Sequence, residues 1–224
     1  MAQAAARKDQ YGLYADQFNN LDNTRGHYEE TGPEIYEQMK GNLDVFVMGS
    51  GTGATISGVS NYLKRKRGLK TSVILADVNG SSLYNWVKYD TLYTGEEREG
   101  HKLRKVNRTV IEGTGLNWLC ENTSRALIDD AEKVTDQEAY TMAKYMLKNE
   151  GILIGSTTAV NLVAMVKHLR RNNLTNKKAL TIACDDGFNH MSKFYSSSQW
   201  KAEGFKEPSN IEIKGFMDLT WITL

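Results

Sequence analysis

Short runs of apolar residues alternate with longer amphipathic segments from residue 33 onward. Four runs have the length and the apolar content of buried strands, and they cover 44–48, 71–78, 151–155 and 179–184. Strands that alternate with helices usually pair in parallel. The pattern therefore predicts an α/β fold with a mostly parallel, twisted sheet that is flanked by helices.

The segments between these runs carry the signals of helix ends. Thr135 and Glu138 have the spacing of a capping box, and Pro33 suits the first turn of a helix. Cations followed by Gly68 are typical of a helix C-terminus. The expected helices cover 33–40, 56–67, a segment that begins at 135, and about 158–171. The charged, non-periodic stretch 94–107 predicts an exposed loop.

Small polar residues follow three of the expected strands. They lie at 49–55, 155–158 and 185–187. Ligands of open parallel sheets bind at the carboxyl ends of the strands. We therefore expect the functional site where these three segments meet.

The glycine-rich segment 49–55, GSGTGAT, is typical of a phosphate-binding turn. A triphosphate-binding loop is excluded, because it needs a lysine directly after the glycines and none occurs before Lys64. A dinucleotide site fits the pattern G-x-G-x-x-A, with Asp77 as the acceptor for a ribose hydroxyl. A single terminal phosphate on backbone N–H groups fits as well, assisted by the hydroxyls of Thr52 and Thr55. A glycine turn that only packs a strand against a helix is the third interpretation.

The composition narrows the class of protein. The 224 residues are 40% hydrophobic and 25% charged with a net charge of +1, so nothing favours nucleic acid or an anionic membrane as a partner. No apolar stretch approaches the about 18 residues of a membrane helix, and the start lacks the apolar core of a secretory signal. The cationic run 64–70 is interpreted as a solvated helix end. Two distant cysteines and four scattered histidines show no metal-ligand spacing. We expect an intracellular protein without a metal.

Six segments, taken together and in this order, resemble the cysteine synthases and their cystathionine β-synthase relatives. They are ADQFNN (15–20), HYEETGPEIYEQ (27–38), GSGTGATISGVSNYLK (49–64), IEGTGLN (111–117), GILIGSTTAVN (151–161) and CDDGFNHMSKFY (184–195). The stretches EEREG and LIDDAEKVTD look closest to the fungal-type branch. The resemblance implies a pyridoxal-phosphate (PLP) enzyme of fold type II, which is the tryptophan-synthase-β-like fold.

The resemblance also implies roles for individual residues. The cofactor phosphate would lie on Gly51, Thr52, Gly53, Ala54 and Thr55. Gly113 falls where the family's backbone approaches the cofactor and substrate, and Gln17 matches a glutamine that holds the substrate carboxylate. Thr157 falls where the family has a serine that contacts the pyridine nitrogen, and a neutral hydroxyl there would leave this nitrogen unprotonated. By itself, Thr157 could instead cap the following helix.

Two features depart from the family pattern. The family's Schiff-base lysine and the substrate loop after it have no counterpart in this chain, so the resemblance implies no catalytic residue here. We expect an N-terminally truncated chain that lacks most of the small domain and is inactive alone. Asp186 and Asn189 stand where the family has serine and arginine, and we expect the added carboxylate to change the electrostatics near the pyridine ring.

These observations predict three regions and one preferred function. Residues 1–30 would be a remnant of the junction with the small domain, 31–200 the PLP-binding large domain, and 201–224 an extension that adds a strand or an oligomer contact. The expected reaction is β-replacement, from O-acetylserine and sulfide to cysteine, in the cytoplasm or mitochondria, with a homodimer as a possible assembly. The alternatives are a non-catalytic PLP- or phosphate-binding module and an NAD-binding Rossmann oxidoreductase.

Overall fold

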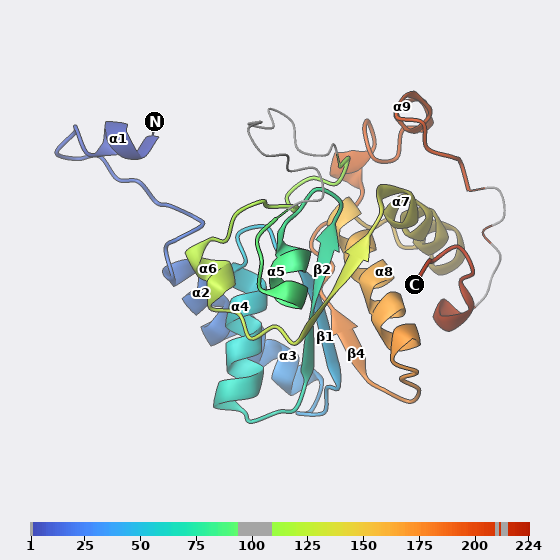
Figure 1. Ribbon diagram of the computed structural model, residues 1–224, viewed down its shortest axis with the longest axis horizontal. Helices are drawn as coiled ribbons and strands as arrows, with labels where there is room; N and C mark the ends of the chain where they lie inside the picture. The colour runs from blue at the N-terminus through green and yellow to red at the C-terminus, as the bar shows by residue number, and fades with distance from the viewer. Residues whose placement is uncertain (1, 94–108, 209–210, 212–214) are drawn as a thin grey trace.

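The computed structural model describes residues 2–93, 109–208, 211 and 215–224, and in this part of the chain four parallel strands form a sheet (Figure 1). From one edge to the other they are β3 (Asp130–Val134), β2 (Ser72–Val78), β1 (Val45–Gly49) and β4 (Ala179–Thr181). All three pairings are parallel. The parallel α/β sheet predicted from the sequence is confirmed. The expected loop at 94–107 lies outside the described residues.

One predicted strand was wrong, and one observed strand was not predicted. The segment 151–155 is no strand, because it is the connection between two helices, and Ile154 makes only an isolated antiparallel bridge to Asp186. Its apolar residues are divided between the core and solvent, with Ile154 buried and Ile152 52% exposed. Conversely, the edge strand β3 was not expected, since its sequence DAEKV holds three charged residues.

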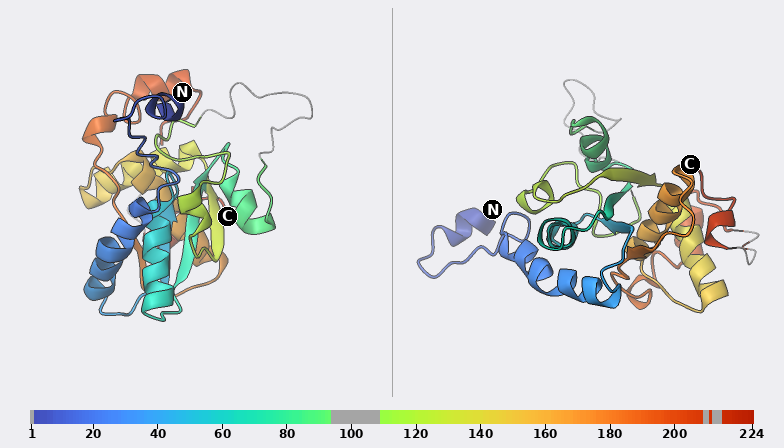
Figure 2. Two further views of the ribbon diagram at one scale, coloured as in Figure 1. Left: turned by 90° about the vertical axis from the view of Figure 1, so that its left-hand side faces the viewer. Right: turned by 90° about the horizontal axis from the view of Figure 1, so that it is seen from below.

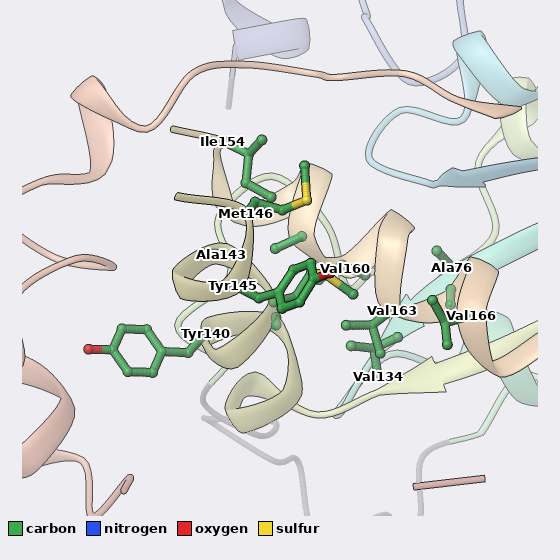
Figure 3. Packing of buried hydrophobic residues seen from close by; sticks show 14 of the residues in the cluster. Ala76, Val134, Tyr140, Ala143, Tyr145, Met146, Ile154, Val160, Val163 and Val166 are labelled. Atoms are coloured by element: carbon green, nitrogen blue, oxygen red, sulfur yellow. The ribbon is translucent and has the colours of Figure 1, made fainter. Parts of the chain in front are cut away.

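Helices cover both faces of the sheet. Residues alternate along β1, so Val45 and Val47 point to one face and Phe46 to the other. Helices α7 (Asp136–Tyr145) and α8 (Ser156–Arg171) pack on the first face, and Figure 3 shows side chains of both helices in this cluster. The second face is covered by α3 (Gly32–Gln38), α4 (Ala54–Asn61) and α5 (Leu83–Tyr89).

The helix-end signals agree with the structure. The capping box of Thr135 and Glu138 is formed at the start of α7, and Pro33 lies in the first turn of α3. Helix α4 continues as a π-helical turn, Tyr62–Lys66. The remaining helices are α1 (Ala2–Ala6), α2 (Asp22–Gly26), α6 (Glu121–Ser124) and α9 (Ser197–Ala202), the π-helical turns η1 (His27–Thr31) and η3 (Met146–Glu150), and the 3-10 turns η4 (Phe188–His190) and η5 (Phe216–Asp218). None of the helices in the described residues is long and apolar enough to cross a lipid bilayer.

The two ends of the described chain differ in how they pack. Helix α1 stands away from the body, and the nearby Leu13 is 89% exposed (Figure 2). At the other end, Leu219 and Ile222 are buried in the cluster that α7 and α8 form. Residues 215–224 contain the turn η5 and no strand. They therefore extend the core rather than the sheet.

Candidate functional site

The glycine segment joins β1 to α4 in a turn that only small residues can form. Gly53 lies before α4 with φ = +79°, and a Cβ there would lie 2.0 Å from Oγ1 of Thr123. A Cβ at Gly51 would lie 2.4 Å from the carbonyl oxygen of Gly113, which itself has φ = +83°. The turn is thus packed closely against the short helix that holds Thr123, Glu121–Ser124, and against the loop that holds Gly113. The N-terminus of α4, whose first N–H groups have no partner within the helix, begins directly behind it.

Side-chain hydroxyls and one histidine support this turn. The hydroxyl of Thr55 lies 3.1 Å from Nε2 of His27, and Nδ1 of the same ring lies 2.9 Å from the hydroxyl of Thr31. Burial lowers the pKa of His27, so the ring is neutral at pH 7. Thr52 accepts from the backbone N–H of Ala54 at 3.4 Å. His27 was not predicted as a site residue, although it lies in one of the segments that carry the family resemblance.

A cavity of about 370 Å³ opens at the carboxyl ends of β1 and β4. Its lining residues come from the four segments 48–55, 112–114, 157–161 and 184–185. A cavity therefore lies where the site was predicted, and residues of all three expected segments line it.

The structure brings most of the predicted site residues together. The cavity is lined by Gly51, Thr52, Gly53, Thr55, Gly113 and Thr157. Ala54 lies behind the lining as the buried first residue of α4. Gln17 is exposed and outside the lining, while its carbonyl oxygen accepts from the amides of Asn23 and Asn122.

Thr157 belongs to the first turn of α8 and faces a carboxylate. The helix cap is Gly155, so the alternative that Thr157 caps this helix is wrong. The Thr157 hydroxyl donates to Oδ1 of Asp185 at 3.5 Å, and the other oxygen of this carboxylate contacts Nε2 of His190. The first turn of α8 thus places the Thr157 hydroxyl at the cavity, and this hydroxyl contacts the Asp185–His190 pair.

Of the two neighbouring carboxylates Asp185 and Asp186, only Asp185 lines the cavity. Asp186 is exposed, lies outside the lining and accepts the backbone N–H of Phe188 at 2.8 Å. Because neighbouring residues in this extended segment point to opposite sides, Asp185 reaches the cavity and Asp186 does not. The expectation that Asp186 changes the electrostatics near the pyridine ring is corrected, because the carboxylate that lines the cavity here is that of Asp185.

Asn161 links the strands that frame the cavity. Its Oδ1 accepts the backbone N–H of Gly49 at 2.8 Å, and its Nδ2 lies 3.5 Å from Sγ of Cys184. The side chain is 1% exposed. This residue was not predicted, because an asparagine inside a helix gives no signal of a contact made 112 residues away.

Asp77 is not placed to bind the ribose of a nucleotide. It is 1% exposed, it lies outside the cavity lining, and it accepts the backbone N–H of Tyr84 at 2.7 Å. Burial raises the pKa of this carboxyl to about 6. The dinucleotide hypothesis therefore lacks the acidic residue on which it depended.

The chain is similar to known proteins in both sequence and structure. A family model described as "Pyridoxal-phosphate dependent enzyme" matches residues 1–185. Cysteine synthase 2 of Neurospora crassa is 45% identical over 190 residues, which are 82% of this chain and 41% of that protein. A putative mitochondrial cysteine synthase of Saccharomyces cerevisiae is 41% identical, with 84% of this chain and 48% of that protein covered.

A solved structure has the same fold. The O-acetylserine dependent cystathionine beta-synthase from Helicobacter pylori superposes with a TM-score of 0.69 at 28% identity, covering 85% of this chain and 56% of that chain. The chain spans a little under half the length of the curated relatives described above.

Proposed function

Because the chain belongs to the family of pyridoxal-phosphate-dependent enzymes, we propose that the cavity at the ends of β1 and β4 is its cofactor site. The observation that carries this proposal is the turn at Gly51, where a Cβ would lie 2.4 Å from the carbonyl oxygen of Gly113. Backbone N–H groups at a helix N-terminus bind phosphate, and side chains in the turn would displace it. The residues present fit a phosphate ester.

The phosphate would lie on the segment from Gly51 to Thr55. The turn and the first N–H groups of α4 supply donors, and the positive end of the helix favours the negative charge. The hydroxyls of Thr52 and Thr55 line the same part of the cavity. His27, neutral and bound to Thr55, would hold that hydroxyl in place.

The remaining predicted residues would serve the ring and the substrate. When bound, pyridoxal phosphate supplies an electron sink for reactions at the α-carbon of an amino acid. The Thr157 hydroxyl would lie at the ring nitrogen, the Gly113 backbone would lie beside the substrate, and Gln17 would bind the substrate carboxylate. Gln17 would have to reach the cavity from outside its present lining.

For the whole protein we propose β-replacement, in which cysteine is formed from O-acetylserine and sulfide. The names of the fungal relatives, which are cysteine synthases, support this choice. A cytoplasmic or mitochondrial location and a homodimer are part of the same proposal. One relative is named as mitochondrial.

A non-catalytic binding module is the second candidate for this polypeptide alone. It is favoured by the lining of the cavity, where the described residues include no lysine that could hold the cofactor covalently. Formation of cysteine from O-acetylserine and sulfide by the purified 224-residue chain would contradict this second candidate.

Calorimetric titration with pyridoxal 5′-phosphate and with inorganic phosphate tests the phosphate site. Gly51→Ala should weaken both ligands by about tenfold or more, since overpacking of this kind costs about 1–3 kcal/mol. The matched control is Gly26→Ala, because nothing lies within 4 Å of a Cβ added there. No binding to the wild-type chain, or equal loss in both variants, would refute the proposed site.

A further inference from the structure

Three potential metal ligands converge between the edge strand β3 and helix α8, away from the cavity. Asp130 and Glu132 are two positions apart on β3, so their side chains point to the same face of the sheet, which α8 covers. His168 lies in the last turn of α8. One ligand atom of each residue lies within 4.8 Å of those of the other two. The group forms no motif in the sequence, because its members come from a strand and from a helix distant in the chain.

Each carboxylate is held by a cation through one oxygen and turns its other oxygen to the histidine. Oδ1 of Asp130 contacts Nζ of Lys88, and Oε2 of Glu132 lies 3.1 Å from a guanidinium nitrogen of Arg171. Oδ2 of Asp130 and Oε1 of Glu132 lie 3.9 and 3.8 Å from Nδ1 of His168. Contacts behind the ligating atoms orient the ligands of metal ions in proteins in the same way.

The buried carboxylate of Glu132 is the feature that points to a bound ion. Its side chain is fully buried, and neither of its oxygens accepts a hydrogen bond from the part of the chain that the structure describes. Burial of a carboxylate without hydrogen bonds is costly, and the ion pair with Arg171 engages Oε2 alone. A cation between Oε1 and the ring of His168 would compensate the buried charge.

The ring of His168 presents a lone pair, and not a proton, to these oxygens. Nδ2 of Asn172, a group that can only donate, lies 3.3 Å from Nδ1 of His168. A ring nitrogen that accepts this bond carries no proton. The separations of 3.8 and 3.9 Å from the two carboxylates are also too long for hydrogen bonds. Three atoms with lone pairs therefore face one another, which is the arrangement of metal ligands.

The kinds of donor atom and their spacing fit zinc. Imidazole nitrogen together with carboxylate oxygen is typical of Zn²⁺ sites, and three protein ligands leave the fourth tetrahedral position for water. Zinc bonds of about 2.0–2.2 Å place tetrahedral ligands about 3.4 Å apart, so the separations of 3.8 and 3.9 Å have to close by about half an ångström. The side chain of Asp130 is 27% exposed, which gives an ion a path from solvent.

We propose that Asp130, Glu132 and His168 form a binding site for a zinc ion, which joins β3 to α8. The site goes beyond the proposed function and does not depend on it, because none of the three residues lines the cavity. Lys88 and Arg171 already neutralise part of the carboxylate charge, so the site binds zinc more weakly than closed sites with four protein ligands do. The bound ion stabilises the native state, since the ligands come together only when the strand and the helix have docked.

Thermal unfolding of the full chain with and without zinc chloride tests the site, in a buffer free of phosphate and chelators. At a zinc concentration about 100 times the Kd from calorimetric titration, Tm should rise by about 5–10 °C, and EDTA should reverse the rise. Magnesium chloride at the same concentration should have little effect, because imidazole is a poor ligand for Mg²⁺. The absence of a rise with zinc would mean that His168 pairs with the carboxylates as an imidazolium, and this result or an equal rise with magnesium would overturn the proposal.

Four variants attribute the effect to these residues. Glu132→Gln, His168→Asn and the partly exposed Asp130→Asn should each weaken zinc binding at least about tenfold and remove most of the rise in Tm. The rise is measured within each variant, so a change in the stability of the zinc-free protein does not affect the comparison. Asp129→Asn is the matched control, because this neighbouring carboxylate precedes β3 and pairs with Lys64, and it should keep the wild-type affinity for zinc. Unchanged zinc binding in the three cluster variants, or an equal loss in the control, would overturn the proposed site.

Discussion

Asp77 shows how one buried residue couples stability to pH. Its carboxyl is 1% exposed in β2, and burial is the largest cause that raises its pKa from 3.8 to about 6. The native state therefore binds a proton more tightly than the unfolded state. The stability that this provides is complete below pH 3.8 and is lost as the pH rises through about 6.

We expect Asp77→Asn to stabilise the protein at pH 7. The neutral amide keeps an acceptor for the N–H of Tyr84 and removes the cost of a buried charge, which corresponds to about 2–3 kcal/mol. Urea unfolding at pH 7 and at pH 4 measures the effect, which should nearly vanish at pH 4. Asp186→Asn, at an exposed position, should change the unfolding free energy by less than about 0.5 kcal/mol at either pH. A gain at pH 4 as large as that at pH 7 would show that charge is not the cause.

Individual site residues were predicted from the sequence only where a local motif marks them. The glycine turn is such a motif, because Gly53 has a positive φ and a Cβ at Gly51 would meet the carbonyl oxygen of Gly113. His27 and Asn161 were missed, since their roles depend on contacts with residues distant in the chain. Whether Asp185 or its neighbour faces the cavity depends on the local backbone direction, which no sequence pattern here reports.

At the scale of secondary-structure elements, the junction of α8 with β1 and β4 determines how the cavity is framed. One side chain, Asn161, contacts the last residue of β1 and the segment that follows β4. Replacement of this amide would leave the N–H of Gly49 without its partner. A buried donor that loses its acceptor costs more than the hydrogen bond contributes.

Asn161→Leu should therefore lower both stability and ligand affinity. We expect the unfolding free energy to fall by about 1–3 kcal/mol, the usual cost of a buried unpaired polar group. Thermal or urea unfolding measures the first effect, and titration with inorganic phosphate the second. Asn42→Leu, at an exposed position ahead of β1, is the control, and a similar loss there would contradict a specific role for Asn161.

Which elements could be predicted follows from how completely each is buried. β1 and β2 lie in the middle of the sheet and are mostly apolar, and both were predicted within a residue or two. β3 escaped prediction because it is an edge strand whose charged residues find partners, such as Arg171 at 3.1 Å from Glu132. The run 151–155 was wrongly predicted as a strand, because a short apolar sequence is equally typical of a strand and of a buried connection.

The architecture of the whole molecule confirms what the family resemblance implied. The parallel sheet with helices on both faces matches fold type II of the pyridoxal-phosphate enzymes, as the structural neighbour shows. The boundaries at 30/31 and 200/201 stay predictions. The residues after 215 are nevertheless bound to the core, because the hydroxyl and N–H of Thr223 donate to Glu138 at 3.2 and 3.0 Å.

Glu138 joins this C-terminal segment to an ion pair in the core. Nζ of Lys167 lies 2.9 Å from Glu138 in a pair that is less than 10% exposed, and it also donates to the carbonyl oxygen of Lys133. Lys167→Met would leave the carboxylate buried without a counter-ion, and we expect a loss of about 3–5 kcal/mol in unfolding free energy.

Chemical unfolding of two variants tests this expectation. Lys177→Met removes an ion pair of similar length, 3.0 Å to Asp44, in which both partners are partly exposed. It should cost no more than about 1 kcal/mol. Comparable losses in the two variants would mean that burial does not determine the strength of the Glu138 pair.

The cavity wall is drawn from segments that are separated by up to 137 positions in the chain, from Met48 to Asp185. The entropic cost of closing such long loops has to be overcome before these segments come into contact. We therefore expect the cavity to form late in folding, together with the docking of α8 on the sheet. A phosphate ester that binds this cavity would stabilise only the completed fold, by an amount that rises with its concentration.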